Sequence, residues 1–224
     1  MAAPPAAAPR PFASLLSARP TWAVGAIHGE AGRLRALHAE LGRRLQPGQN
    51  LVYLGNYLGR GPDVRGTVQE LLLFRRDILA RPRVWLDDVA YLRGAQEEMW
   101  AKLLQIQFAP NPTEVLRWLE ARGIGQTVVA YGGRMEEAPL AAREGALSLT
   151  KWTSALRDGI RAAEGHNALL SALKHAAYTN DKTLLFVSSG LDADRPLTEQ
   201  GDSFWWGAAD FERIDKPYGD YRRI

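Results

Sequence analysis

The chain contains no cysteine, and this absence excludes several classes of protein at once. A disulfide-stapled scaffold, a thiolate zinc site and a cysteine nucleophile all need the missing residue. A run of about 18 apolar residues is missing too, so the sequence predicts no membrane-spanning segment. The N-terminus lacks the charged start and long apolar core of a signal peptide, and we expect a cytoplasmic protein.

A strong charge of one sign is also missing. The 224 residues carry 28 Lys and Arg against 25 Asp and Glu, a formal net charge of +3. Because the basic residues are spread along the chain, they favour a solvated surface over a nucleic-acid footprint. Hydrophobic residues make up 46% of the chain and include 7 Trp, 7 Tyr and 6 Phe, which is enough for a buried core. We therefore expect a globular protein that binds neither membranes nor nucleic acid.

The first 20 residues differ in composition from the rest. Residues 1–20 are dominated by Ala and Pro, and proline-rich sequence does not hold a helix. We expect an extended or disordered tail over residues 1–20. No linker divides the remainder, so residues 21–224 are predicted to form a single domain.

Strands and helices are predicted to alternate after this tail. Short apolar runs indicate strands at Thr21–Ala26, Asn50–Gly55 and Val89–Leu92. Between them, apolar residues at helical spacing predict helices at Glu30–Leu45 and Val64–Ile78. This alternation is typical of an α/β fold with a mostly parallel sheet.

The middle of the chain is predicted to be helical, with a return to strand near the end. Apolar periodicity predicts helices at Gln96–Phe108, Thr113–Arg122, Ser148–Ala163 and His166–Ala177, and a strand at Thr183–Ser188.

Four loops follow the predicted strands, where open α/β sheets carry their functional residues. They are Gly25–Glu30 (GAIHGE), Gly55–Asp63 (GNYLGRGPD), Arg93–Glu97 (RGAQE) and Ser188–Leu191 (SSGL). In this order they resemble the motifs of the calcineurin-like metallophosphoesterase superfamily, in particular its bacterial serine/threonine phosphoprotein-phosphatase branch. Thr127–Gly132 (TVVAYG) is similar to a T-L-x-S-Y-G segment of that branch.

The resemblance implies a fold and a chemistry. The implied fold is a sandwich of two mixed sheets flanked by helices. The implied chemistry is phosphate-ester hydrolysis by two divalent ions held by the motifs G-D-x-H-G, G-D-x-x-D-R-G, G-N-H-E and H-A-G. The His of the third motif acts as the general acid, and the second Asp of the second motif orients it.

Most of these functional positions are substituted in this chain. The ligand positions for Asp, the bridging Asp, Asn and the later His are occupied by Ala26, Asn56, Ala95 and Ser188. Gln96 stands at the position of the general acid and cannot deliver a proton at neutral pH, and Gly59 stands at the position of its orienting Asp. Of the metal-binding, acid and phosphate-contacting positions, only two are retained: His28, a metal ligand in the family, and Arg60, a phosphate contact.

Two functions of different classes follow. The first is a catalytically inactive pseudophosphatase without metal or other cofactor, which binds phosphate or a phosphoprotein through Arg60 and His28 or acts as a scaffold. His28 is equally compatible with a hydrogen bond that only stabilises its turn. The second is an active phosphatase with a rebuilt site and a pair of Mn, Fe or Zn ions, acting on phosphoproteins or dinucleoside polyphosphates.

Other prominent side chains are interpreted as structural. His38 and His175 are predicted on the surface of amphipathic helices, and His166 is predicted to cap or pack near a helix start. The paired Trp205 and Trp206 are expected in the core.

The C-terminal end departs from the family pattern. The family continues beyond a P-Y-G-x-x-R-R segment, here Pro217–Arg223, with another strand and a further metal-binding His. We therefore expect C-terminal strands to be missing beside Phe204, Trp205 and Trp206. An open strand edge there would favour a homodimer or a strand supplied by a partner chain.

Overall fold

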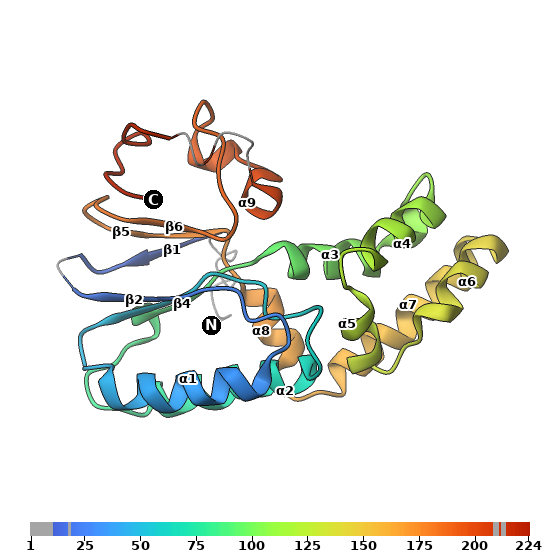
Figure 1. The fold of residues 1–224 in the computed structure, drawn as a ribbon, viewed down its shortest axis with the longest axis horizontal. Helices are drawn as coiled ribbons and strands as arrows, with labels where there is room; N and C mark the ends of the chain where they lie inside the picture. Colours follow the sequence, from blue (N-terminus) through green and yellow to red (C-terminus); the bar gives the residue numbers. More distant parts are fainter. Residues whose placement is uncertain (1–10, 18, 208–210, 212–213) are drawn as a thin grey trace, which may run out of the picture.

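A computed structural model describes residues 11–17, 19–207, 211 and 214–224 of the chain. Figure 1 shows two small sheets at one end of the molecule and an arm of helices at the other. Within the described residues each sheet has three strands, in the orders β1-β5-β6 and β2-β3-β4. The predicted α/β class is confirmed at this level.

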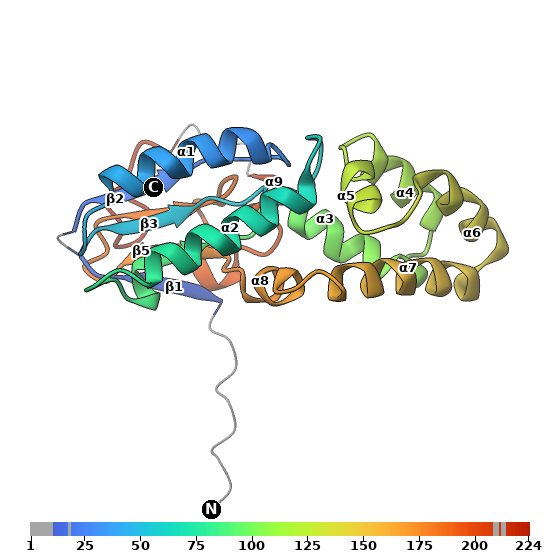
Figure 2. The same cartoon turned by 90° about the horizontal axis from the view of Figure 1, so that it is seen from below.

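The β2-β3-β4 sheet is parallel and contains the first three predicted strands. Its members are β2 (Thr21–Val24), β3 (Asn50–Tyr53) and β4 (Val89–Tyr91). All four residues of β3 are buried because it is the central strand. The crossover helices α1 (Ala31–Arg44) and α2 (Val64–Leu79) pack together along the outer side of the sheet (Figures 1 and 2). The predicted strand–helix order is therefore confirmed, with ends shifted by a few residues.

The second sheet corrects two expectations. In it, β1 (Phe12–Leu15) pairs in parallel with β5 (Ala176–Thr179), which pairs antiparallel with β6 (Leu185–Val187). The prediction of an unstructured tail over residues 1–20 is wrong for β1, whose Leu15 is buried between the sheets with Ala177. The Ala- and Pro-rich composition of residues 1–20 gave no signal for this short strand. Residues 1–10 lie outside the described part of the chain.

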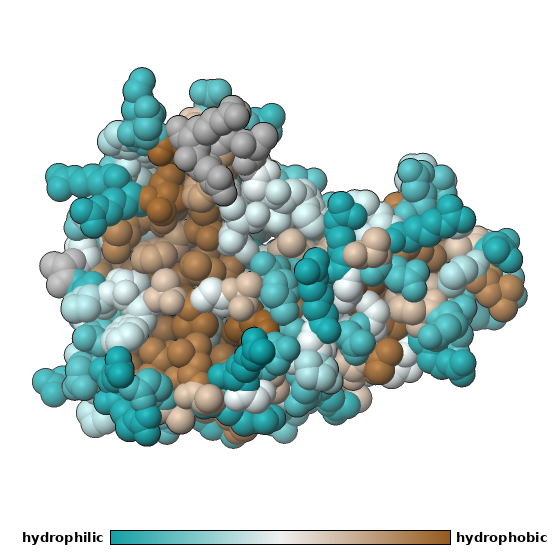
Figure 3. Space-filling model, in the orientation of Figure 1, coloured by the Kyte–Doolittle hydropathy of each residue, from teal (hydrophilic) through white to brown (hydrophobic). Residues whose placement is uncertain are grey.

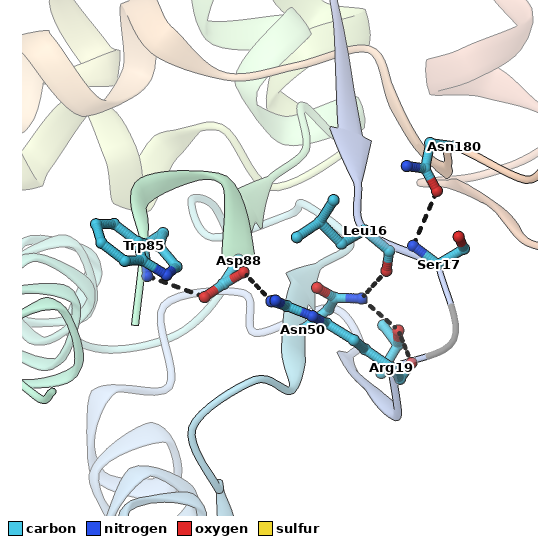
Figure 4. Close-up of polar contacts among 8 residues, drawn as sticks. Leu16, Ser17, Arg19, Asn50, Trp85, Asp88 and Asn180 are labelled. Atoms are coloured by element: carbon cyan, nitrogen blue, oxygen red, sulfur yellow. Dashed lines mark hydrogen bonds and ion pairs between the residues drawn. The ribbon is translucent and has the colours of Figure 1, made fainter. Parts of the chain in front are cut away.

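Leu16, Ser17 and Arg19, which lie between β1 and β2, form polar contacts (Figure 4). Asn50 donates a hydrogen bond from Nδ2 to the Leu16 carbonyl at 3.0 Å. Arg19 forms an ion pair of 2.8 Å with Asp88, whose side chain is only 2% exposed. These contacts link Leu16 to β3 and Arg19 to the turn before β4, so the prediction of an unstructured tail is also wrong for these two residues.

The arm is built from helices between β4 and β5. The helices between β4 and β5 are α3 (Ala95–Leu104), α4 (Pro112–Glu120), α5 (Gly125–Ala130), α6 (Ala138–Glu144), α7 (Ala146–Arg161) and α8 (His166–Ala172). Helix α9 (Ser203–Trp206) follows β6. Short 3-10 turns occupy Leu86–Asp88, Ile106–Phe108, Met135–Glu137 and Leu197–Glu199. Within the described ranges, no helix has both the length and the apolar character needed to cross a bilayer.

The helix predicted at His166–Ala177 is wrong in its second half. The structure ends α8 at Ala172 and forms β5 from Ala176 onward. The apolar run fits either element locally, and pairing with β1 selects the strand.

The largest buried apolar cluster extends from the β2-β3-β4 sheet into the helices of the arm. Figure 3 shows hydrophobic surface concentrated on the strand-bearing part, whereas the arm is largely hydrophilic on this face. Phe204 and Trp205 are buried in a cluster with Tyr218, and Trp206 packs against it partly buried. The prediction that Trp205 belongs to the core is confirmed.

His38 and His175 are not the surface residues that the sequence predicted. His38 is 3% exposed, because α2 packs over it: its Nδ1 lies 2.7 Å from Glu70 Oε1, and its ring stacks on Phe74. His175 lies outside α8, half-buried against the rings of Phe204 and Trp205.

The C-terminal segment pairs beside the start of β6. The Leu185 amide donates to the Arg223 carbonyl at 2.9 Å, and the Arg223 amide donates to the Thr183 carbonyl at 3.2 Å. Association of two copies through this edge stays a prediction.

Candidate functional site

The parallel strands bring three of the four predicted loops together. The His28 amide donates to the Asn56 carbonyl at 2.7 Å, and the Gly61 amide donates to the His28 carbonyl at 2.6 Å. The Gln96 amide, at the start of α3, donates to Asn56 Oδ1 at 3.0 Å. His28, Asn56 and Gln96 therefore meet at the carboxyl ends of β2, β3 and β4. Ser188 follows β6 in the other sheet.

Three residues of these loops have an unfavourable backbone conformation. His28, Asn56 and Arg60 have φ values of 53°, 56° and 40°, in the left-handed region that favours glycine. Such strain persists only where the surrounding contacts determine the conformation, and it is concentrated at functional sites in many proteins.

A buried carboxylate that sequence reasoning missed holds the second loop. Glu97 is 3% exposed, and its two oxygens accept hydrogen bonds from the amides of Asn56, Tyr57, Leu58 and Gly94 at 2.8–3.0 Å. Convergent amides of this kind are suited to an anion, and here the anion is the protein's own side chain. A Glu three residues after the N-cap Gly94 was the available sequence signal.

Gln96 fills the space beside Gly59. Its amide Nε2 donates to the Arg122 carbonyl at 3.0 Å, while Oε1 is buried without a hydrogen-bond partner in the described part of the chain. A Cβ atom placed on Gly59 would overlap this side-chain amide. The Gly59 amide donates to Thr127 Oγ1 at 2.9 Å, so the segment Thr127–Gly132, whose first four residues belong to α5, also reaches this point through Thr127. Gly59 and Gln96 thus fit each other and leave no room for an aspartate at position 59.

The residues at the family's ligand positions do not fit a pair of divalent ions. Ala26 and Ala95 have no donor atom, and Asn56 Oδ1 already accepts from the Gln96 amide. The Glu97 oxygens are engaged by four amides, whereas two hard cations need free carboxylates. Among the residues that the structure describes, no three His, Cys, Asp or Glu side chains are grouped as metal ligands.

Two arginine side chains lie at the outer side of the loops. Arg60 is exposed, with its amide bonded to the Gly123 carbonyl at 3.1 Å and its Nε 3.4 Å from the Arg122 carbonyl. The Arg122 guanidinium lies 4.2 Å from the centre of the Trp118 ring. Neither arginine forms an ion pair with another described residue. Their charges are therefore available to an anion.

His28 adds a hydrogen-bonding group rather than a charge at neutral pH. Burial lowers the pKa of His28 below its usual 6.5, and the Arg60 charge lowers it further, against smaller opposing effects of Glu97 and a bond to the Leu58 backbone. Its Nδ1 is buried without a partner in the described ranges.

From the pKa values of the histidines we predict that the free energy of unfolding decreases in mild acid. Burial lowers the pKa of His28, His38, His166 and His175 alike. Below about pH 6.5 the unfolded chain therefore binds protons that the folded chain excludes, so stability is complete above that pH and falls as the pH decreases. We expect a lower urea midpoint at pH 5.5 than at pH 7.5. The shifted carboxylates, such as Glu40, have pKa values below their usual 4.5 and do not titrate in this window. An equal or higher midpoint at pH 5.5 would contradict this prediction.

Comparisons with known proteins give structural neighbours only. No family model and no curated protein matches the chain. A crystal structure of a putative diadenosine tetraphosphatase is 17% identical, with a TM-score of 0.42, over 84% of this chain and 59% of that one. A serine/threonine phosphatase from Saccharomyces cerevisiae with similarity to human phosphatase PP5 is 16% identical, with a TM-score of 0.40, over 91% and 47%. The chain thus spans about half to three fifths of the length of these neighbours.

Proposed function

We propose that the chain is a phosphatase-like module without phosphatase activity, which binds a phosphate group of a phosphorylated protein at the loops carrying Arg60 and His28. The observation that carries this proposal is the packing of Gln96 and Glu97. Gln96 fills the space beside Gly59 with a neutral amide, and Glu97 accepts hydrogen bonds from the loop amides, so neither side chain is free to hold a metal ion.

Loss of catalysis follows from the chemistry of these residues. Gln96 is neutral, its amide is bonded to the Arg122 carbonyl, and it offers no proton for a leaving group. Glu97 is committed to the loop amides, so it is not free to act as a metal ligand or a base. Neither Gln96 nor Glu97 can therefore act as a proton donor or hold a metal ion that activates water.

Anion binding follows from the unpaired arginines. An exposed guanidinium forms paired, charge-assisted hydrogen bonds to phosphate oxygens. The Arg60 amide donates a hydrogen bond to the Gly123 carbonyl, and Arg122 directly precedes Gly123 in the chain. Because both side chains are exposed, a phosphate displayed on the surface of a partner fits better than a deeply bound small substrate.

Two measurements test this function. We expect hydrolysis of p-nitrophenyl phosphate to stay at background with added Mn²⁺, whereas inorganic phosphate should shift the amide NMR signals of Arg60 and Gly61. Arg60→Gln should weaken this response about tenfold, in line with the loss of one charge-assisted contact. Arg143→Gln removes an exposed arginine of α6 and should leave the response unchanged. Turnover that requires Arg60 would instead support an active phosphatase with a rebuilt site.

A further inference from the structure

A cavity of about 740 Å³ lies away from the strand-end loops. It is formed by β1, the turn before β4, β4 itself, α2 and α8, and none of its lining residues belongs to the four loops. It therefore lies at the edge where β1 and β4 end their sheets. A volume of this size is typical of sites for small organic molecules.

Much of the cavity wall is apolar. Phe12 of β1, Leu72 of α2, Val89 of β4, and Leu169 and Ala172 of α8 contribute hydrocarbon surface. Such a wall suits the hydrocarbon part of a ligand, because covering it removes apolar area from water.

One residue of the cavity wall has a buried hydroxyl without a partner. Tyr91 is 7% exposed, and its hydroxyl has no hydrogen-bond partner among the residues that the structure describes. Burial raises the pKa of Tyr91, so the phenol is neutral and can donate. A buried polar group without a partner is unfavourable, and a ligand acceptor would satisfy it.

An unpaired cation lies close to this hydroxyl. Arg75 of α2 lines the same cavity, half-buried, and forms no ion pair with any described residue. Its charge acts on Tyr91, lowering the pKa against the effect of burial. Asp87 and Lys174 also line the cavity, so the formal charges of its wall sum to one positive charge.

We propose that this cavity binds an amphipathic carboxylate, whose single negative charge contacts Arg75 and the Tyr91 hydroxyl while its hydrocarbon body covers the apolar wall. A monoanion matches one excess positive charge and one neutral donor. This site is independent of the phosphate-binding loops, and either proposal can fail without the other.

Calorimetry with decanoate tests the proposal on the full chain. Decanoate is expected to bind, 1-decanol to bind at least tenfold more weakly, and inorganic phosphate not to compete. Arg75→Gln should weaken decanoate binding about tenfold, because a charge-assisted contact is lost. Arg76→Gln, which changes the exposed neighbouring residue on α2, is the matched control and should bind as the unchanged chain does. Absence of decanoate binding, or equal binding of decanol, would overturn the proposal.

Tyr91→Phe separates a ligand contact from a structural role. Removing a buried hydroxyl without a partner should leave the melting temperature unchanged or raise it, while decanoate affinity falls severalfold. A lower melting temperature with unchanged decanoate affinity would assign the hydroxyl to the fold and overturn its role in binding.

Discussion

Replacing Glu97 by alanine is expected to lower the free energy of unfolding by about 4 kcal/mol. Four backbone amides lose their acceptor, and each buried donor left unpaired costs about 1–3 kcal/mol before water enters. Those amides belong to Asn56, Tyr57, Leu58 and Gly94. Urea unfolding, followed by circular dichroism, measures the change.

Two further variants calibrate this result. Glu97→Gln keeps one acceptor oxygen, and we expect roughly half of the loss, about 2 kcal/mol. Glu120→Ala removes an exposed carboxylate of α4 and should change stability by no more than about 0.5 kcal/mol. If Glu97→Ala costs no more than Glu120→Ala, the loop amides are not held as the structure indicates.

Replacing Gly59 by alanine is expected to cost about 3 kcal/mol, from strain at positive φ and overpacking. Gly59 has a φ of 80°, and the added Cβ would overlap the Gln96 amide. The double variant Gly59→Ala/Gln96→Ala should lose at least about 1 kcal/mol less than the sum of the two single variants, because the overlap is gone.

A control glycine in α1 separates this overlap from general effects of the added methyl group. Gly32→Ala places its Cβ in open space and should stabilise the chain slightly, by about 0.5–1 kcal/mol. Strictly additive losses for Gly59→Ala and Gln96→Ala would mean that Gln96 does not occupy the space beside Gly59.

Apolar periodicity in the sequence predicted those helices and strands whose formation depends on neighbouring residues. The order of β2, α1, β3, α2 and β4 followed from apolar periodicity within short windows. By contrast, β1 and β5 form because residues far apart in the chain pair, which no short window contains. The same limit explains His38, whose burial depends on Glu70 and Phe74 of the neighbouring helix.

The meeting of three strand-end loops could be predicted from the sequence, but the packing of their side chains could not. Parallel strands bring their carboxyl ends to one edge, so the meeting of His28, Asn56 and Gln96 was foreseeable. The hydrogen bonds from the loop after β3 to Glu97 were not foreseeable, because a capping glutamate usually accepts hydrogen bonds only from amides at its own helix end. The fit of Gln96 to Gly59 depends on side-chain direction, which sequence spacing does not specify.

Metal analysis of the purified chain after incubation with Mn²⁺ tests the central claim most directly. Because Ala26, Asn56 and Ala95 provide no carboxylate and the Glu97 oxygens are bonded to loop amides, we predict a metal content far below one ion per chain and no turnover of p-nitrophenyl phosphate. Near-stoichiometric Mn, Fe or Zn, lost together with turnover in a His28→Ala variant, would contradict it.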